Sequence, residues 1–334
     1  MNEFFRLNPK PTKLRALLCF INDSCLFSHM AHLNFQLLQV LVVVIFIDYF
    51  SGVRIPDTFG NMSCLRYLLF EGDIYGKLPN CMVKLKRLET LDISNSFIKH
   101  PTGVWKSTQL KHLLGLNQAF NSCCSISPFS PNVYSLPRNN LQTLMWMNDK
   151  YFEPRLLHQL INLRKLGIWS VSDSTVKILS ALSPVPTTLE VLKLYFFRDT
   201  SEQINLLSYP NIVKLHLNGR MPLNCEAFPP NLVKLTLRNF EVDGHVVAVL
   251  KKLRKLRILK MVSCNHMEEK MDLSGDGDGD SFSQLEVLHV QDPFRLSEVT
   301  CTDDVSMPKL KKLLLIERTD SNVRLSEKLA KLRI

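Results

Sequence analysis

Three groups of residues in this sequence have side chains that could do chemistry at a site. The first is SGDGDGDS, from Ser274 to Ser281, in which aspartates alternate with glycines. Alternating carboxylates bind Ca²⁺ in EF-hand loops, which also need a glycine at position 6 and a glutamate at position 12. Here Ser281 and Val287 occupy those places, and Glu286 falls one residue early. We therefore interpret the string as an acidic, flexible insertion and predict no metal site at Asp276, Asp278 and Asp280.

The second group is GDIYGKL, from Gly72 to Leu78, which is close to the phosphate-binding loop G-x-x-x-x-G-K-[ST]. The backbone amides of that loop surround phosphates, and its hydroxyl residue holds Mg²⁺. Gly72 and Gly76 are one residue too close together, and Leu78 replaces the hydroxyl residue. The sequence therefore predicts no nucleotide-binding site.

The third group is the histidines and cysteines, nine of each. No histidine lies in an H-E-x-x-H motif, and no serine lies in a G-x-S-x-G motif. His216 and His289 occupy positions that we expect to point away from a core, as surface histidines. The cysteines form no C-x-x-C pair, which is typical of reduced thiols in a cytosolic protein. We predict that this protein is not an enzyme and holds no cofactor.

The elements that position these residues follow from a repeated pattern. The chain reads NIVKLHL at residues 211–217 and NLVKLTL at residues 231–237. Both strings fit L-x-x-L-x-L with other apolar residues allowed, and the same pattern recurs at a mean spacing of about 25 residues, the period of leucine-rich repeats. The thirteen starts are Leu14, Leu38, Leu65, Leu88, Leu110, Leu141, Leu163, Leu189, Ile212, Leu232, Leu256, Leu285 and Leu310.

This spacing predicts an α/β leucine-rich-repeat solenoid with a parallel β-sheet on its concave face and an irregular or short-helical convex side. Burying each leucine between neighbouring repeats contributes roughly 1.5–3 kcal/mol before entropy is subtracted. We expect a lead-in over 1–13, the solenoid over 14–315 with the acidic insertion at 272–281, and a tail over 316–334 with room for a short capping helix. The apolar run VLVVVIFI at 40–47 is too short to span a membrane, which takes about 20 residues, so we expect a buried strand there.

One stretch carries a resemblance to a known family. LPNCMVKLKRLETLDISNSFIKHPTGVWKSTQLKHL, from Leu78 to Leu113, resembles a phrase of the intracellular nucleotide-binding leucine-rich-repeat disease-resistance proteins of plants, with His100-Pro101 in place of a second Leu-Pro. The resemblance implies a cytoplasmic recognition domain in innate immunity. Such a domain binds a pathogen effector or a host protein, or restrains a nucleotide-binding module. A ubiquitin-ligase substrate receptor or scaffold, and a truncated receptor without an independent role, remain alternatives.

The residues between the leucines should line the concave face, because side chains alternate along a strand. Early repeats present mostly apolar residues there, at Ala16, Val40, Val42, Tyr67, Leu69 and Leu114. Later repeats present basic and aromatic residues, with Asn218 and Thr236 between them. We predict that this later set binds a protein partner with an acidic surface; the alternative is that its lysines only keep exposed strands soluble. The set is Lys165, Trp169, Lys193, Tyr195, Lys214, His216, Lys234, Arg238 and Lys260.

The charge of the chain is consistent with an acidic partner. The net charge is +10, and KKLRKLRILK at residues 251–260 holds six basic residues in ten. Such a run could contact nucleic acid or an acidic lipid. However, its charges alternate with leucine positions of a repeat, and no nucleic-acid module accompanies it. We therefore expect neither a nucleic-acid partner nor a membrane span.

Overall fold

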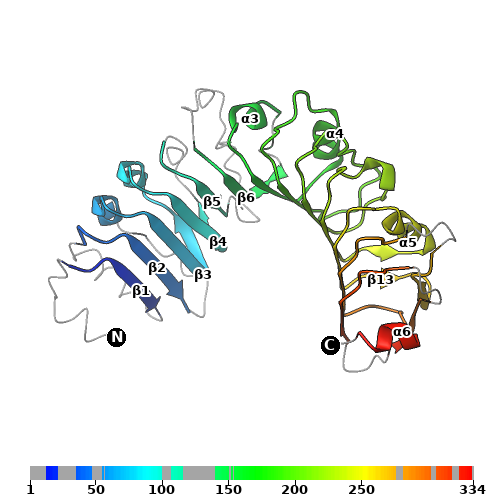
Figure 1. The fold of residues 1–334 in the computed structure, drawn as a ribbon. Helices are drawn as coiled ribbons and strands as arrows, with labels where there is room; N and C mark the ends of the chain where they lie inside the picture. The colour runs from blue at the N-terminus through cyan, green and yellow to red at the C-terminus, as the bar shows by residue number, and fades with distance from the viewer. Residues whose placement is uncertain are drawn as a thin grey trace. The chain divides into compact units, whose positions relative to one another are not determined.

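Thirteen parallel strands form the main sheet of this protein in a computed structural model that describes residues 13–21, 35–46, 55, 57–99, 107–115, 140–149, 152, 154–275, 281–301, 306–317 and 323–332. Within these residues the strands follow one another in the sheet in chain order (Figure 1). They are β1 Ala16–Ile21, β2 Val40–Ile45, β3 Tyr67–Lys77, β4 Thr90–Lys99, β5 His112–Leu114, β6 Thr143–Asn148, β7 Lys165–Trp169, β8 Val191–Tyr195, β9 Lys214–Asn218, β10 Lys234–Arg238, β12 Ile258–Val262, β15 Val287–Gln291 and β17 Lys312–Ile316.

Each of these strands begins two residues after the first leucine-type residue of a predicted repeat. The predicted start at Ile212 precedes β9, for example, and the predicted start at Leu310 precedes β17. Within a strand the leucines point inward, so Leu215 and Leu217 are at most 1% exposed while Lys214, the first residue of β9, is exposed. The structure confirms the predicted fold, a leucine-rich-repeat solenoid with a parallel sheet and short helices.

The chain divides into two compact units, Met1–Gly167 and Ile168–Ile334. In the first unit, short helices return the chain between strands: η1 Asp57–Asn61, η2 Asn80–Lys84 and α3 Pro154–Gln159. In the second unit, α4 Asp173–Ala181 and α5 Gly244–Lys251 lie on one side of the strands, and the return segments also include η6 Cys225–Ala227 and α6 Glu327–Ala330 (Figure 1). The core of each unit lies between its strands and these segments, as shown by buried Tyr209, whose hydroxyl donates to the carbonyl of Leu179 at 2.8 Å.

Asparagines link neighbouring repeats at the point where the chain enters a strand. The Nδ2 of Asn231 donates to the carbonyl oxygen of Pro210 at 2.8 Å, and Asn211 donates in the same way to Thr187. In the first unit, Asn140 donates to the carbonyl of Thr108 at 3.0 Å. The asparagine that NIVKLHL and NLVKLTL share therefore has a structural role, since it satisfies a backbone carbonyl of the preceding repeat.

Ion pairs follow the same stacking at the edge of the sheet. In the second unit, Glu286 pairs with Arg257 on the preceding repeat and with Lys311 on the next, at 3.5 Å for the lysine. Glu89 pairs with Arg66 and Lys111 in the same arrangement in the first unit. Because these groups are exposed to solvent, such pairs contribute little to the free energy of unfolding. Their regular placement instead reflects the register that the buried leucines set.

The residue after several strands adopts a left-handed backbone conformation that turns the chain away from the sheet. Five such residues in the second unit have positive φ, and all are small or polar; they are Ser170, Gly219, Asn239, Ser263 and Asp292. Polar residues tolerate this conformation better than apolar or branched ones, and glycine adopts it without strain. Gly219 has φ of 113°, and a methyl group added there would lie 2.5 Å from the carbonyl oxygen of Phe196.

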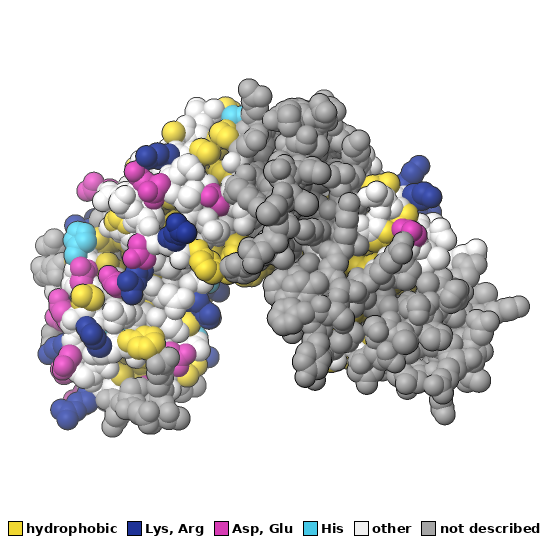
Figure 2. Space-filling view, turned by 180° about the vertical axis from the view of Figure 1, so that it is seen from behind, with side chains coloured by type: hydrophobic (Ala, Val, Ile, Leu, Met, Phe, Trp, Pro, Cys, Tyr) yellow, Lys and Arg dark blue, Asp and Glu magenta, His cyan; other side chains and the backbone are white. Residues whose placement is uncertain are grey.

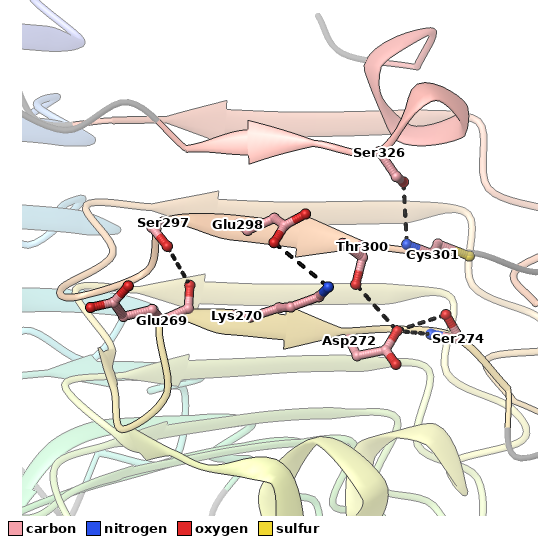
Figure 3. A network of polar contacts seen from close by, with 9 residues as sticks. All are labelled: Glu269, Lys270, Asp272, Ser274, Ser297, Glu298, Thr300, Cys301 and Ser326. Atoms are coloured by element: carbon pink, nitrogen blue, oxygen red, sulfur yellow. Dashed lines mark hydrogen bonds and ion pairs between the residues drawn. The ribbon is translucent and has the colours of Figure 1, made fainter.

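The return segments of the second unit contain two smaller parallel sheets. Strands β14 Lys270–Asp272, β16 Glu298–Thr300 and β18 Arg324–Leu325 form one, and β11 Glu241–Val242 pairs with β13 Asn265–His266. Asp272 accepts hydrogen bonds from the amide and hydroxyl of Ser274, at 2.9 and 2.6 Å, and one from Thr300 on the next strand (Figure 3). The serine hydroxyl of Ser326 likewise accepts from the amide of Cys301.

The last sheet strand of the second unit is covered by the segment that contains α6. Leu329 of this helix is fully buried, and the amide of Leu313 in β17 donates to the carbonyl of Leu332 at 3.0 Å. Exposed strand edges are templates for pairing with other chains. The α6 segment therefore occupies part of the edge that β17 would otherwise offer.

We predict that Gly219→Ala destabilises the second unit by about 1–3 kcal/mol, because a side chain must adopt a strained φ and approach the Phe196 carbonyl. The matched control is Asn239→Gly at the same position of the next repeat, where φ is 55° and glycine fits without strain. Urea unfolding followed by far-UV circular dichroism measures both. Equal losses of stability in the two variants would contradict this account of the turns.

The second prediction concerns His266, which is 2% exposed and whose Nε2 has no hydrogen-bond partner among the described residues. Burial lowers its pKa to about 4, whereas an unfolded histidine titrates near 6.5. Between these two values the unfolded state binds more protons, so stability must fall as the pH falls through this window. The expected loss is about 2 kcal/mol between pH 8 and pH 5.

His266→Gln should reduce the pH dependence of unfolding over this window by about that amount. The control is His245→Gln at an exposed position of α5, which should leave the pH dependence as it is in the original chain. Chemical unfolding at a series of pH values provides the measurement. A pH dependence that is the same in the His266→Gln variant would show that this histidine is not buried as a neutral group.

Candidate protein-binding surface

The outward-pointing side chains of β8, β9, β10, β12, β15 and β17 form what we call the open face of the second unit. Because these strands pair in register, their side chains align in three rows across the sheet. None of these positions is acidic. The first row is Val191, Lys214, Lys234, Ile258, Val287 and Lys312; the middle row is Lys193, His216, Thr236, Lys260, His289 and Leu314; the last row is Tyr195, Asn218, Arg238, Val262, Gln291 and Ile316.

Five cations gather on four neighbouring strands of this face, and we call them the basic cluster: Lys193, Lys214, Lys234, Arg238 and Lys260. Burial lowers the pKa of Lys234, and repulsion from Lys260, Lys214 and Lys193 lowers it further. Among the described residues, no carboxylate forms an ion pair with Lys214, Lys234, Arg238 or Lys260. These four side chains therefore carry positive charge that no carboxylate in the described part of the chain pairs with.

Another surface of the same unit has a different character. In the space-filling view, the face turned to the viewer carries basic and acidic side chains close to one another (Figure 2). Ion pairs of exposed side chains also occur in this unit, since Arg220 pairs with Asp199 at 3.8 Å and with Glu241 at 3.4 Å. Mixed charge of this kind is ordinary for a protein surface, whereas charge of a single sign attracts ligands of the opposite sign. This contrast distinguishes the open face.

His216 lies in the middle of the basic cluster. Its ring centroid is 5.3 Å from that of Tyr195. Burial lowers the pKa of His216 to about 4, with repulsion from Lys193, Arg238 and Lys234 as further causes. His216 is thus neutral at pH 7 and adds no charge to the cluster.

His289 is the second histidine of the middle row. Both of its ring nitrogens are inaccessible and have no hydrogen-bond partner among the described residues. Burial lowers its pKa as well, and so does the charge of Lys260. From the sequence we expected surface histidines at His216 and His289, but the side chains of neighbouring strands cover both rings in part.

Three aromatic residues border the basic cluster. The ring of Trp169 lies 5.6 Å from that of Tyr195 and meets Phe197 edge-on at 5.5 Å. Phe197 is 59% exposed, while Tyr195 is only 8% exposed. Tyr195 therefore packs against Trp169, and little of its ring is accessible to a partner. Phe197 was missing from the sequence prediction, although it continues the alternation of Lys193 and Tyr195 by two residues.

One residue of the predicted binding set, Lys165, lies outside the second unit. Lys165 belongs to the first unit, where it is one cause of the lowered pKa of His112, after burial. The early strands of that unit do present apolar side chains, with Leu18, Phe20 and Val40 exposed. The strands of the first unit also contain acidic residues, with Glu71 on β3 and Asp92 on β4.

The basic run at 251–260 does not form one patch. Lys251 ends α5 and is 9% exposed, and the Nζ of Lys255 donates to Asn231 at 2.6 Å. Arg257 pairs with Glu286, and Lys260 lies in the open face. The basic side chains of this run therefore lie on different parts of the repeat, consistent with their alternation with leucine positions in the sequence.

Comparison with known proteins now identifies the architecture. The family described as "Leucine-rich repeat region" matches residues 13–331. The chain belongs to the leucine-rich-repeat family. A solved structure of an internalin from Listeria monocytogenes aligns with a TM-score of 0.54 at 16% identity, covering 96% of this chain and 84% of that one, and it supports the fold alone.

Curated relatives of this leucine-rich-repeat chain are plant resistance proteins. The "ToMV resistance protein Tm-2(GCR236)" of Solanum lycopersicum is 62% identical over 99% of this chain, and the "ToMV susceptible protein tm-2" of the same plant is 63% identical. "Putative disease resistance RPP13-like protein 2" of Arabidopsis thaliana is 30% identical over 80% of this chain and 30% of its own length. The chain spans 39% of the length of the two Solanum proteins.

These findings bear on the chemistry considered at the outset. A leucine-rich-repeat region of a resistance protein is non-catalytic, as the sequence predicts. In the described part of the chain, no three His, Cys, Asp or Glu side chains are grouped as metal ligands. Asp276, Asp278 and Asp280 lie outside the described residues. No helix within the described ranges is long and apolar enough to cross a membrane.

We predict that Lys234→Gln raises the pKa of His216, because it removes one of the cations that repel the protonated imidazole. The control is Lys312→Gln on β17, in the same row but three strands further along, which should leave this pKa unchanged. A histidine titration by nuclear magnetic resonance measures the change. An equal pKa in the two variants would contradict the proposed mutual repulsion within the basic cluster.

Proposed function

We propose that this chain is the protein-recognition part of a plant disease-resistance receptor, and that the open face of its second unit binds a protein partner with an acidic surface. The observation that carries this proposal is the basic cluster, which has an exposed aromatic ring at its border and no acidic residue in its rows. Aromatic residues and arginine are enriched where binding energy concentrates, and complementary charge speeds association.

The kind of partner follows from the relatives. Proteins named for resistance to ToMV are 62% identical to this chain, which supports a role in defence with a pathogen protein or a host protein as the ligand. The relative named as susceptible is just as similar, so overall identity does not separate the two outcomes. We infer that a small number of surface residues between the leucines decides which outcome a given repeat region gives.

Two further parts of the proposal concern the whole receptor. Because the chain covers only part of its relatives, restraint of a nucleotide-binding module in the same protein is a second role that the repeat region would perform. The proposed location is the cytoplasm, where such receptors meet pathogen proteins that enter the cell. Both roles use surfaces of the repeats, and neither needs a cofactor.

The test places this chain in the matching region of the Solanum ToMV resistance protein and measures virus accumulation in leaves that express the chimaera. We expect the chimaera to restrict ToMV and the triple variant Lys214→Gln, Lys234→Gln and Arg238→Gln to lose most of this restriction. A charge-matched control changes Lys252, Lys255 and Lys309 to glutamine, since these exposed residues lie off the open face.

Two results would count against the proposal. If the unsubstituted chimaera fails to restrict virus in leaves where the parent protein succeeds, the resistance role is wrong for this chain. If the triple variant and the charge-matched control behave alike, the open face is not the binding surface. Protein levels must be compared by immunoblot, because a variant that fails to accumulate would lose restriction for a trivial reason.

A further inference from the structure

The first unit has a surface that the proposed function does not use. Alternate side chains of β1, β2 and β3 point away from the core, while the residues between them, such as Leu41 and Val43, are buried. Because these neighbouring strands pair in register, the outward side chains align in three rows (Figure 1). We call them the apolar face: Ala16, Val40 and Tyr67 in the first row, Leu18, Val42 and Leu69 in the second, and Phe20, Val44 and Glu71 in the third. Glu71 is the one charged residue among them.

Several side chains of the apolar face are open to solvent. Leu18 is 54% exposed and Phe20 is 43% exposed, whereas Cys19 and Ile21 beside them are each 1% exposed. Phe46 follows β2 and continues its alternation; this ring is 64% exposed and stacks on Phe20, with ring centroids 6.2 Å apart. Contiguous apolar side chains on the surface of a soluble protein mark places where another molecule packs.

The packing of the repeats does not require apolar residues at these positions. In the second unit, Lys214 and Lys234 begin β9 and β10, just as Val40 and Tyr67 begin β2 and β3. Both pairs of strands are parallel and pair in register from these residues. Since lysine serves equally well at the start of a strand, the valine and tyrosine are better explained by a contact outside the described chain.

Two carboxylates give one side of the apolar face a negative charge. Glu71 lies on β3, and Asp92 lies on β4 beside Leu69, with which it pairs in register. Burial raises the pKa of Tyr67, and the charges of Asp92 and Glu71 raise it further, which indicates that the three groups lie close together. The exposed phenylalanines lie at the β1 and β2 side of the face, so the apolar and the acidic parts are neighbours.

The partners of these carboxylates within the described residues are neutral. Asp92 accepts hydrogen bonds from the amide and hydroxyl of Ser94, at 3.0 and 2.7 Å, and Glu71 accepts one from the side-chain amide of Asn95 at 3.3 Å. In the described part of the chain, neither carboxylate forms an ion pair with a basic side chain. Neutral donors leave the negative charge in place, so a cation brought by a partner would form the stronger, charge-assisted hydrogen bonds here.

We propose that the apolar face of the first unit binds an apolar segment of a partner protein, and that a lysine or arginine of this segment lies against Glu71 and Asp92. Aromatic or branched side chains of the segment would pack on Phe20 and Phe46. Complementary charge at the other side would fix the orientation of the segment. This surface is separate from the open face and prefers the opposite charge, so the proposal goes beyond the proposed function and does not depend on it.

The test selects short random peptides from a displayed library on the full chain and keeps those that no longer bind to the variant Phe20→Ser with Phe46→Ser. We expect the kept peptides to be enriched in apolar residues and in lysine or arginine. Fluorescence anisotropy should show that the two substitutions weaken binding by about tenfold or more. The matched control is Leu37→Ser with Val83→Ser, which changes exposed apolar residues outside the sheet strands and should leave binding unchanged.

A double-mutant cycle tests the contact between charges. The basic residue of a kept peptide is replaced by glutamine, and the chain carries Glu71→Gln with Asp92→Asn. On the original chain the basic peptide should bind about fivefold more tightly than its glutamine form. On the variant chain the two peptides should bind equally. Glutamine and asparagine keep an oxygen that can accept the hydrogen bonds described above, and circular dichroism verifies that each variant is folded.

Defined outcomes overturn this inference. The first is a selection that yields no peptide dependent on Phe20 and Phe46, and the second is a set of kept peptides without enrichment in lysine or arginine. A fivefold preference that persists on the variant chain would show that the two carboxylates do not meet the cation.

Other occupants of the apolar face would be recognised as follows. Self-association of the chain in sedimentation velocity, if lost in the Phe20 and Phe46 variant, would assign the face to a second copy. Binding to phosphatidylcholine vesicles that is lost in the same variant would assign it to lipid. If a kept peptide binds the chain alone but not the chimaeric receptor, another part of the receptor covers the face. Each of these results would reject the proposed segment.

The two proposals can fail separately. The open-face variant with Lys214→Gln, Lys234→Gln and Arg238→Gln should bind the kept peptides as the original chain does. Loss of virus restriction in that variant with intact peptide binding would support both proposals. Restriction by the chimaera without any peptide that depends on Phe20 and Phe46 would reject this inference and retain the proposed function.

Discussion

The packing of leucines from one repeat against those of the next is the constraint on which the other features of this protein depend. Leu215 and Leu235 occupy equivalent positions on paired strands, and both are at most 1% exposed. A shift of one residue would turn such leucines outward and bring lysines into the core, which costs far more than any surface contact returns. The inward leucines therefore fix the register, and the register places every outward side chain.

Much of this arrangement could be predicted from the sequence, because the leucine pattern is a direct consequence of burial. All of the predicted repeat starts precede a sheet strand by two residues. Five of the predicted basic residues lie on paired strands of the open face, namely Lys193, Lys214, Lys234, Arg238 and Lys260. The prediction was weaker where neighbouring strands decide a side chain's surroundings. The partial burial of His216 and the nearly complete burial of Tyr195 depend on residues from adjacent repeats, which a pattern within one repeat does not contain.

The basic cluster illustrates how binding and stability oppose each other. The pKa of Lys234 is lowered by burial first and by its lysine neighbours second. Like charges on neighbouring strands repel one another, and this repulsion works against folding. The chain tolerates it because the buried leucines beneath supply the stability. A partner that brings carboxylates to the cluster would relieve the repulsion, so part of the binding energy would come from repulsion already present in the free protein.

The sequence prediction omitted Phe197 because this residue follows strand β8, beyond the last leucine position of the repeat.

The close similarity of NIVKLHL and NLVKLTL has a consequence for how such a surface can change over generations. The two strings lie twenty residues apart and pair strand to strand in register. Unequal crossing-over between their coding sequences would delete or duplicate a whole repeat without disturbing the leucine packing. One duplication would add a lysine to the first row and move the aromatic ring away from Lys260 by one strand spacing, about 4.8 Å. The spacing between chemical features on this face can therefore change in uniform steps through recombination, while substitutions alter the features themselves.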